Sequence, residues 1–420
     1  MSTYIQKINW KVTEYMYLDK IFFPDIFTEV PLELSSGTNL LKPSEIILNS
    51  INAASYDDYN YYSSPLGNNE IRNSILKFEE QYFNKEFPKN IRASLTSGAA
   101  DALRLTFQYL YGIGKRKVLV LGLQYPIIFQ NITNAGIQYH QLITNNIHQG
   151  YLPTIQEILA HYSECKFDTL FLTQPNNPAG SIYTESEFNK IVKFAKGNNI
   201  FIVYEKIGSD LPFDIMSGER INHSSLVDSN YLSYIIIDSF SKKRAISGLR
   251  LGYIVAGKDF IEFINYNRFG DCPTLIGQNG LEEDIKITTE IVKINGEYSS
   301  SQNHAQKKQI KYLENMYGIY KKNLHYFKKK MKDFILNVSP YNGGFNVVVE
   351  LNIHCDEIKF ALDLFNETKI IIYPIGCFEV RDMVEIEKRN LQFRLSLAED
   401  SKNFKPKVNQ FRRFINQYAS

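Results

Sequence analysis

One short stretch, residues 239–253, places a lysine among small hydroxyls, with an arginine eight residues further on. Ser239 and Ser241 precede Lys242, and Arg250 follows it. A lysine amine can form a Schiff base with a carbonyl cofactor. Hydroxyls and an arginine can hold a phosphate through charge-assisted hydrogen bonds. The stretch therefore predicts a site for a phosphorylated carbonyl cofactor, and an ordinary basic loop after a strand is the alternative.

The pattern S-x-S-K-x5-G-x-R-x-G in this stretch resembles the lysine segment of class I and II aminotransferases. Members of that family bind pyridoxal 5'-phosphate (PLP) and have the fold type I architecture. The resemblance implies that Lys242 holds PLP and that the neighbouring hydroxyls and Arg250 bind its phosphate. Lys243 is a rival for the Schiff base. However, Gly248 and Arg250 stand six and eight residues after Lys242, which is the spacing of the family.

Two further loops resemble cofactor-binding loops of the same family. Asn177, in residues 174–180, matches the second asparagine of the N-P-x-N-P-T-G loop, which donates to the ring oxygen of PLP. Tyr125 matches the aromatic residue of the P-x-Y-P loop that stacks on the ring, although Leu123 replaces the leading proline. A strand-to-helix turn of small residues lets backbone N–H groups approach a phosphate, and it comprises Ser97, Gly98, Ala99 and Ala100.

Three residues nearer the ends of the chain extend the resemblance to about residues 34–397. Tyr62 resembles the tyrosine that reaches the phosphate bound by the partner subunit, with Tyr61 as a competitor. Arg394 matches the arginine that grips the substrate α-carboxylate as a bidentate fork. Gly37 resembles the glycine of the segment that lies over the substrate. The resemblance thus implies a homodimer that acts on an amino acid and a 2-oxo acid.

The chain departs from the family at the residue beside the pyridine nitrogen. In the family, an aspartate in a D-E-x-Y motif keeps that nitrogen protonated. One register puts Glu205 at the aspartate position and Gly208 at the tyrosine position, and the other puts Tyr204 at the aspartate position. Glu205 lies 28 residues after Asn177, the usual interval of the family. We therefore predict Glu205 as the ring partner, with Tyr204 directed into the sheet and a hydrogen bond to the ring oxygen lost at Gly208.

These residues together predict an aminotransferase that works through a Lys242 aldimine and quinonoid chemistry. Lys242, Glu205 and Asn177 are the predicted catalytic residues, and Lys242 carries the Cα proton to the cofactor. The alternative is a fold type I PLP enzyme of a biosynthetic pathway that performs cyclisation, elimination or oxidation instead. A third reading is a PLP-binding or regulatory domain without catalysis.

The elements that must position these residues alternate between strand and helix patterns over about residues 91–257. Strand-like segments, most of them apolar runs, predict strands, and 3.6-residue patterns predict helices, of which the second begins at a capping-box sequence. Such alternation predicts a mostly parallel sheet covered on both faces, with ligands beyond the carboxyl ends of its strands. The predicted strands are 91–96, 118–121, 168–173, 200–204 and 234–237, and the predicted helices are 98–111 and 184–196.

The pattern changes after residue 257. Residues 268–301 are poorly periodic and predict a long connection, either a lid or a dimer contact. A long helix is predicted over 304–334, followed by strands near 343–349 and 393–397. With the resemblance, this implies a fold type I transferase whose large domain has a sheet of the seven-stranded type. The expected division is an N-terminal arm or part of the small domain at 1–51, the PLP-binding domain at 52–303 and a smaller α+β domain at 304–420.

Composition excludes several classes of partner. The chain has 47 basic and 45 acidic residues among 420, so its net charge of +2 predicts no binding to nucleic acid or to a membrane surface. No secretory signal and no bilayer-spanning apolar stretch are expected. The four cysteines are far apart and form no C-x-x-C pair. They predict reduced thiols in a cytoplasmic protein, with neither a disulfide framework nor a metal site.

Overall fold

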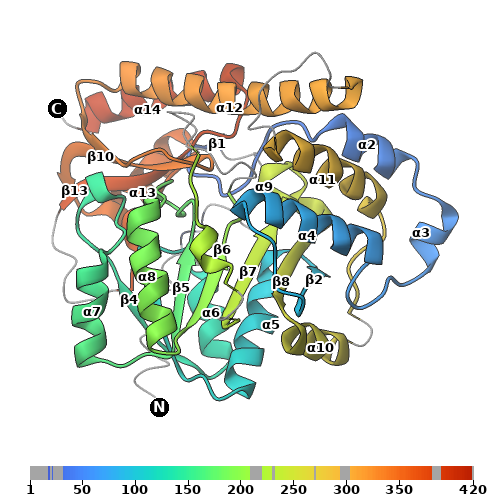
Figure 1. The fold of residues 1–420 in the computed structure, drawn as a ribbon. Helices are drawn as coiled ribbons and strands as arrows, with labels where there is room; N and C mark the ends of the chain where they lie inside the picture. Colours follow the sequence, from blue (N-terminus) through green and yellow to red (C-terminus); the bar gives the residue numbers. More distant parts are fainter. Residues whose placement is uncertain are drawn as a thin grey trace.

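The computed structural model describes residues 18, 21, 32–208, 220–228, 232–268, 271–293, 303–380 and 389–418. Figure 1 shows a large sheet between two layers of helices, and a smaller, antiparallel part built mainly from the C-terminal third of the chain. None of the helices described there is both long and apolar enough to cross a membrane.

The large sheet has seven strands in the order β2-β8-β7-β6-β5-β3-β4. Strand β8 runs antiparallel to the other six strands of this sheet, which all run in one direction. The prediction of a mostly parallel sheet is therefore confirmed. Its strands are β2 (Ile91–Thr96), β3 (Lys117–Leu121), β4 (Gln138–Leu142), β5 (Thr169–Thr173), β6 (Phe201–Glu205), β7 (Tyr234–Ser239) and β8 (Gly252–Gly257).

Each face of this sheet carries its own layer of apolar side chains. On β6, Ile202 and Tyr204 enter one layer, while Phe201 and Val203 enter the other. The first layer packs against α4 (Asn69–Phe83), α7 (Ile155–Glu164), α8 (Glu185–Gly197) and α11 (Gln278–Lys293). The second packs against α5 (Ala99–Gly112), α6 (Ile127–Asn134) and α10 (Lys258–Asn267). Burial on both faces explains the continuous apolar runs of these strands.

Two local predictions need correction. Thr184 caps α8 by accepting from the Glu187 backbone N–H, but the Glu187 carboxylate accepts from the Ile155 backbone instead of completing a capping box. Residues 278–293, predicted as part of a long connection, form helix α11, which packs against α4 and α2 (Glu45–Asn52). Residues 269–270 and 294–301 of that segment lie outside the described residues.

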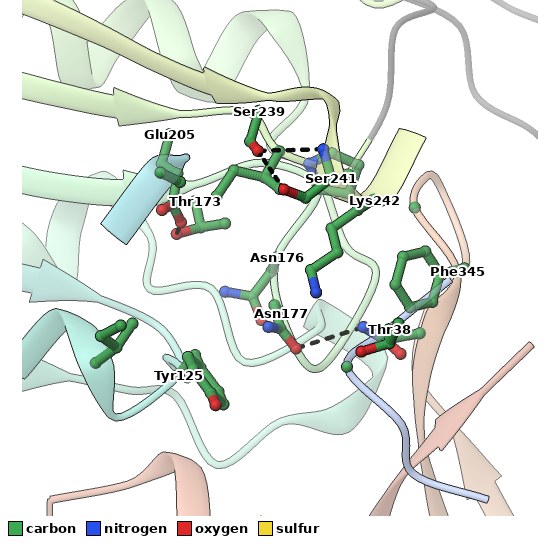
Figure 2. A pocket seen from close by; sticks show the side chains of 18 of the residues that line it. Thr38, Tyr125, Thr173, Asn176, Asn177, Glu205, Ser239, Ser241, Lys242 and Phe345 are labelled. Atoms are coloured by element: carbon green, nitrogen blue, oxygen red, sulfur yellow. Dashed lines mark hydrogen bonds between the residues drawn. The ribbon is translucent and has the colours of Figure 1, made fainter. Parts of the chain in front are cut away.

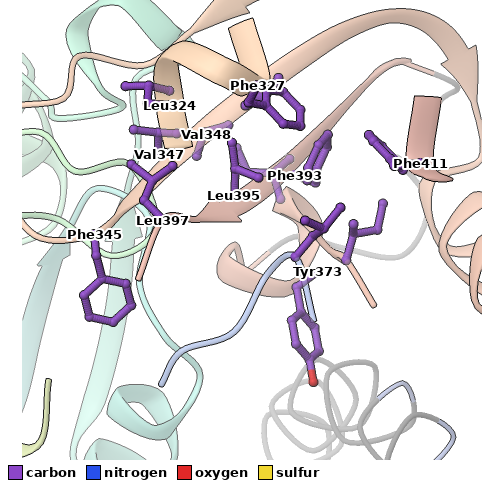
Figure 3. Close-up of a cluster of buried hydrophobic side chains, with 14 of the residues drawn as sticks. Leu324, Phe327, Phe345, Val347, Val348, Tyr373, Phe393, Leu395, Leu397 and Phe411 are labelled. Carbon is purple, nitrogen blue, oxygen red and sulfur yellow. The ribbon is translucent and has the colours of Figure 1, made fainter. Parts of the chain in front are cut away.

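The smaller part is built on a four-stranded antiparallel sheet in the order β12-β13-β10-β9. Aromatic and aliphatic side chains of β10, β13, α12 and α14 form its core (Figure 3). A short strand from the N-terminal region, β1, pairs with β11 and brings Leu34 into the same core. The elements are β1 (Leu32–Glu33), α12 (His304–Lys330), β9 (Ile335–Val338), β10 (Asn346–Cys355), α13 (Glu357–Thr368), β11 (Ile370–Ile371), β12 (Tyr373–Pro374), β13 (Arg389–Ser396) and α14 (Ser401–Tyr418).

The remaining short helices are α3 (Tyr56–Asn60), α9 (Phe240–Lys243) and the 3-10 turns η1 (Ile147–Gln149), η2 (Ser224–Leu226), η3 (Ser247–Leu249) and η4 (Ile375–Phe378). Helix α12 begins at residue 304, where the smaller C-terminal domain was predicted to begin. The division of the chain at residues 51 and 303 stays a prediction.

Candidate active site

A cavity of about 470 Å³ lies at the carboxyl ends of β5, β6 and β7, beside the first turn of α5. The smaller part closes it with residues of β10, β12 and β13 (Figure 2). Ligand binding at this edge is expected for a parallel sheet. The predicted site residues that line the cavity are Gly37, Ala99, Ala100, Tyr125, Asn177, Glu205, Ser239, Ser241, Lys242, Arg250 and Arg394.

The predicted Schiff-base lysine stands on α9, directly after β7. Ser239 ends that strand, and its hydroxyl accepts from the Ser241 backbone N–H at 3.2 Å, which caps the short helix. The Lys242 side chain extends into the cavity toward Asn177 (Figure 2). Burial, together with the positive charges of Arg394 and Arg250, lowers the pKa of Lys242 to about 8. A sizeable fraction of this amine is therefore neutral and nucleophilic near neutral pH.

The rival lysine points elsewhere. Lys243 is buried, and its Nζ lies 2.7 Å from Asp238 Oδ2. Its ammonium also faces the rings of Phe78 and Phe240. A lysine that is held in an ion pair behind the cavity is poorly placed to attack a carbonyl in it. The geometry thus favours Lys242 over Lys243.

Glu205 ends β6 with its carboxyl group in the cavity wall. The Thr173 hydroxyl, at the end of the neighbouring strand, donates to Glu205 Oε2 at 2.6 Å. Burial raises the pKa of Glu205 to about 7, against the lowering effect of the Thr173 hydrogen bond. The side chain of Tyr204 lies on the opposite face of β6, and its hydroxyl is 2.9 Å from His223 Nδ1. Of the two possible registers, the structure thus places Glu205 at the cavity.

Arg394 is a buried cation in the part of the wall formed by β13. Its Nε and Nη2 donate to the Ser35 carbonyl at 3.1 and 2.6 Å, and its Nη1 donates to Asn177 Oδ1 at 3.2 Å. A Cβ at Gly37 would lie 3.5 Å from Arg394 Nη2, so the 35–38 segment passes close over the guanidinium. The arginine is thereby oriented by a backbone carbonyl and a side-chain amide oxygen.

The other end of the cavity is suited to a phosphate. Arg250 has a positive φ of 53°, and its Nη2 donates to the Ser97 carbonyl at 3.3 Å. Gly98 has a φ of 83°, and a Cβ there would lie 2.7 Å from Arg250 Nη2. A glycine at this position therefore leaves room for the arginine. The first turn of α5, at Ala99 and Ala100, completes this end with backbone N–H groups.

Tyr125 and the two N-terminal tyrosines are placed differently. Tyr125 lies in the cavity wall between β3 and α6 (Figure 2). Its loop is fastened by Asn176, whose side-chain amide donates to the Leu123 carbonyl at 2.9 Å. Tyr62 and Tyr61 are 86% and 70% exposed and lie outside the wall of this cavity. Neither tyrosine therefore lines the cavity of its own chain.

Several residues at the site were missed in the sequence. Thr173 was inside a predicted strand, but its hydrogen bond to Glu205 depends on how two strand ends align. Phe345 and Asn346 line the cavity from a segment predicted only as a strand, and Tyr373 lines it from a segment for which no element was predicted. A polar residue at the carboxyl end of each predicted parallel strand was the available signal for Thr173.

A buried charge cluster lies directly behind the cavity and was also missed. Lys206 Nζ lies 3.0 Å from Glu79 Oε1 and 2.7 Å from Asp238 Oδ2, and Tyr253 donates to both acids. Burial lowers the pKa of Lys206, but the charges of Asp238 and Glu79 outweigh burial and raise it above its usual value. With Lys243, the cluster contains two acids and two bases. Lys206, Asp238 and Lys243 are direct sequence neighbours of three residues that line the cavity. These three are Glu205, Ser239 and Lys242. The cluster therefore holds the backbone at these cavity residues in place.

Removing one charge from this cluster is expected to cost much more than removing a surface charge. Lys206→Met should lower the free energy of unfolding by about 3–5 kcal/mol, because two carboxylates are left short of a partner. Lys190→Met, which removes an exposed ion pair with Glu187, is the control and should cost at most about 1 kcal/mol. Urea denaturation at saturating PLP measures both, and equal losses would contradict the structural role of the cluster.

Comparisons with known proteins point to one family. The family model described as aminotransferase class I and II matches residues 29–405. An aspartate aminotransferase of Thermotoga maritima is 21% identical over 76% of this chain and 76% of its own. A probable N-acetyl-LL-diaminopimelate aminotransferase of Bacillus subtilis is 22% identical over 76% of this chain and 74% of its own. A crystal structure of the Thermotoga maritima aspartate aminotransferase has a TM-score of 0.74 at 18% identity, and the match covers 96% of this chain and 97% of that one.

Proposed function

This chain belongs to the class I and II aminotransferase family, and we propose that it transfers an amino group from an amino acid to a 2-oxo acid with PLP as cofactor. The observation that carries the proposal is the convergence of Lys242, Glu205 and Arg394 on one cavity. Those groups match the three needs of the reaction, which are a covalent anchor, a ring partner and a carboxylate clamp. The family favours transamination over cyclisation, elimination or oxidation.

The residues at the cavity fit PLP from its phosphate to its ring nitrogen. Arg250, the hydroxyls of Ser239 and Ser241 and the first turn of α5 would hold the phosphate. A Cβ at Gly98 would displace Arg250, so the glycine allows this arginine and the backbone to approach the phosphate closely. Further along, Tyr125 would cover the ring, Asn177 would donate to the ring oxygen, and Glu205 would face the ring nitrogen. When bound, PLP supplies an electron sink that stabilises negative charge at the substrate Cα.

Lys242 has two tasks in this proposal. Its amine would hold the cofactor covalently, and the same amine would move the Cα proton of a bound amino acid. A pKa of about 8 suits both tasks, because the amine gives up and takes up a proton near neutral pH. Glu205 would face the ring nitrogen and hold its proton. A cation beside Glu205 would lower its pKa from about 7 and hold it as a carboxylate.

We expect Arg394 to bind the substrate carboxylate rather than to stabilise the fold. Arg394→Lys keeps the positive charge but loses the planar fork. We expect the KM for the amino acid to rise about tenfold or more, because a charge-assisted hydrogen bond is worth about 1.5–3 kcal/mol, while PLP binding is retained. Steady-state kinetics and a PLP titration measure the two effects.

The matched control is Arg389→Lys on the same strand, where the arginine pairs with Glu357. It should leave the KM unchanged. If Arg394→Lys retained its affinity, or if the wild-type protein acted equally well on an amine that lacks the carboxylate, the role of Arg394 would be wrong.

A screen of the common amino acids tests the proposed reaction. The PLP-loaded protein should be yellow, and its true donors should change the visible absorption and yield 2-oxo acids when an acceptor 2-oxo acid is present. A protein that stays yellow with every amino acid and forms no product would be a PLP-binding domain without catalysis.

We also propose a homodimer in which Tyr62 reaches the phosphate bound by the partner subunit, with Tyr61 as its competitor. The high exposure of both tyrosines supports the proposal, since a second subunit could cover them. Light scattering at assay concentration should give the mass of two chains. A stable and active monomer would contradict it. The wide separation of the four cysteines in the sequence, with no C-x-x-C pair, supports the cytoplasm as the compartment.

A further inference from the structure

Two histidines and a cysteine meet at the free edge of the large sheet, away from the cavity. His140 lies on the edge strand β4, and His161 and Cys165 lie at the C-terminal end of α7. His140 Nε2 is 3.4 Å from Cys165 Sγ, and the two imidazole centroids are 5.3 Å apart. One ligand atom from each of the three residues lies within 4.8 Å of the other two.

Local structure explains why the three side chains converge. His161 and Cys165 are one helical turn apart, and the Cys165 backbone N–H donates to the His161 carbonyl at 2.8 Å, which ends α7. On β4, Tyr139 enters the layer of α6, so its neighbour His140 faces the opposite layer, where α7 lies. Strand β4 and helix α7 are labelled side by side in Figure 1. The spacing H-x3-C resembles the histidine half of zinc-finger spacings.

The surroundings leave the imidazole of His161 open to a ligand. Its Nε2 is buried and has no hydrogen-bond partner among the described residues. An unpaired buried polar atom is costly, and a metal ion can satisfy it. The nearest lysine in sequence, Lys166, places its ammonium 3.8 Å from the centroid of the Tyr162 ring. The positive charge of that lysine is thus engaged by an aromatic face.

We propose that His140, His161 and Cys165 form a site for Zn²⁺. Two imidazoles and a thiolate are the donors that this borderline-soft ion prefers. Bonds of about 2.0–2.1 Å to nitrogen and about 2.3 Å to sulfur in a tetrahedron imply ligand atoms about 3.3–3.6 Å apart. The observed separations of up to 4.8 Å need a contraction that side-chain rotations can supply. Binding releases the Cys165 thiol proton, and a water molecule completes the tetrahedron.

The position of the site indicates that the ion would stabilise the fold and would take no part in the proposed reaction. None of its three residues lines the cavity. The residue after His140, Gln141, donates to the carbonyls of Gly122 and Phe378 at 2.8 and 2.9 Å. The edge strand therefore ties the large sheet to the smaller part. A Zn²⁺ ion would fasten that strand to α7 and raise the temperature of unfolding by mass action.

Metal titration of the PLP-loaded full chain tests the site. The chain is stripped with a chelator, kept reduced with a reductant that does not bind metal, and titrated with Zn²⁺ by calorimetry and with Co²⁺ by difference absorption. We expect one ion per chain, a thiolate-to-Co²⁺ charge-transfer band and a higher unfolding temperature. Loss of second-shell partners costs about 10–100-fold in metal affinity, so loss of a ligand in Cys165→Ser or His161→Asn should cost at least as much and should abolish the band or weaken it.

Matched control variants distinguish the loss of a zinc ligand from the loss of any other cysteine or histidine. Cys272→Ser changes another part-buried thiol, and His354→Asn changes an exposed histidine on β10. Both should bind as the wild type does. His140→Asn, at an exposed strand position, serves if His161→Asn fails to fold. Absence of binding, equal binding by Cys165→Ser, or a loss of the band in Cys272→Ser would overturn the proposal.

Discussion

Lys242→Ala is expected to lower turnover by at least about a thousandfold, because it removes both the covalent anchor and the group that moves the Cα proton. Its side chain enters the cavity and has a pKa lowered to about 8. The variant should still bind PLP through the phosphate and ring contacts, but a chromatographic step under denaturing conditions should release the cofactor. Turnover and cofactor retention after borohydride treatment measure the two effects.

The identity of the anchored lysine can be read directly by peptide mapping. Borohydride should fix the cofactor on Lys242 in the wild-type protein. An adduct on Lys243 would show that the ion pair with Asp238 fails to hold that lysine.

The rate at which PLP attaches to the cofactor-free protein should rise with pH until about 8 and then level off. Only the neutral amine of Lys242 attacks, and this amine is mostly protonated below its pKa. A rate that continues to rise toward pH 10 would indicate an ordinary exposed lysine.

Glu205→Gln is expected to slow proton transfer by roughly a hundredfold or more. The glutamine keeps the shape of the side chain but cannot hold the proton on the ring nitrogen, and removing one member of a buried charge pair costs about 3–5 kcal/mol. Glu205→Asp should be milder and can even accelerate the step, since the family has an aspartate at this place. Single-turnover kinetics with a known donor measure the step, and binding of PLP should persist in both variants.

Tyr204→Phe is the control for the register. It removes a hydroxyl that pairs with His223 on the far face of β6. A modest loss of stability is therefore expected, with little change in rate. A silent Glu205→Gln combined with a crippling Tyr204→Phe would show that the ring nitrogen faces the phenol and that the chosen register is wrong.

Those features that depend on short runs of sequence could be predicted. Residues 91–96 were predicted as a strand and form β2 with the same bounds, because Ile91, Ala93 and Leu95 alternate with polar residues, which is the period of a strand. The choice of Glu205 over Tyr204 came from counting residues between two motifs that must both reach one cavity. The structure places the two side chains on opposite faces, as that choice requires.

Features that depend on distant partners could not be predicted. Helix α11 lacked a clear period because its buried face carries polar residues, among them Asp284. That carboxylate is paired at 2.6 Å with Arg244, from a segment about forty residues away in the sequence. Lys206 likewise depends on Glu79 and Asp238, which only the fold brings together. The group of His140, His161 and Cys165 escaped notice because a strand supplies one member and a helix end supplies the others.

The most direct test of transamination by this chain is the stoichiometry of product without an acceptor. The PLP-loaded protein is mixed with an excess of a donor amino acid, first without and then with a 2-oxo acid. One 2-oxo acid product per subunit should form and the reaction should stop, because the amino group stays on the cofactor until an acceptor takes it. Adding the acceptor should restart turnover. Continued product formation without an acceptor would contradict transamination and would indicate an oxidase or an eliminase.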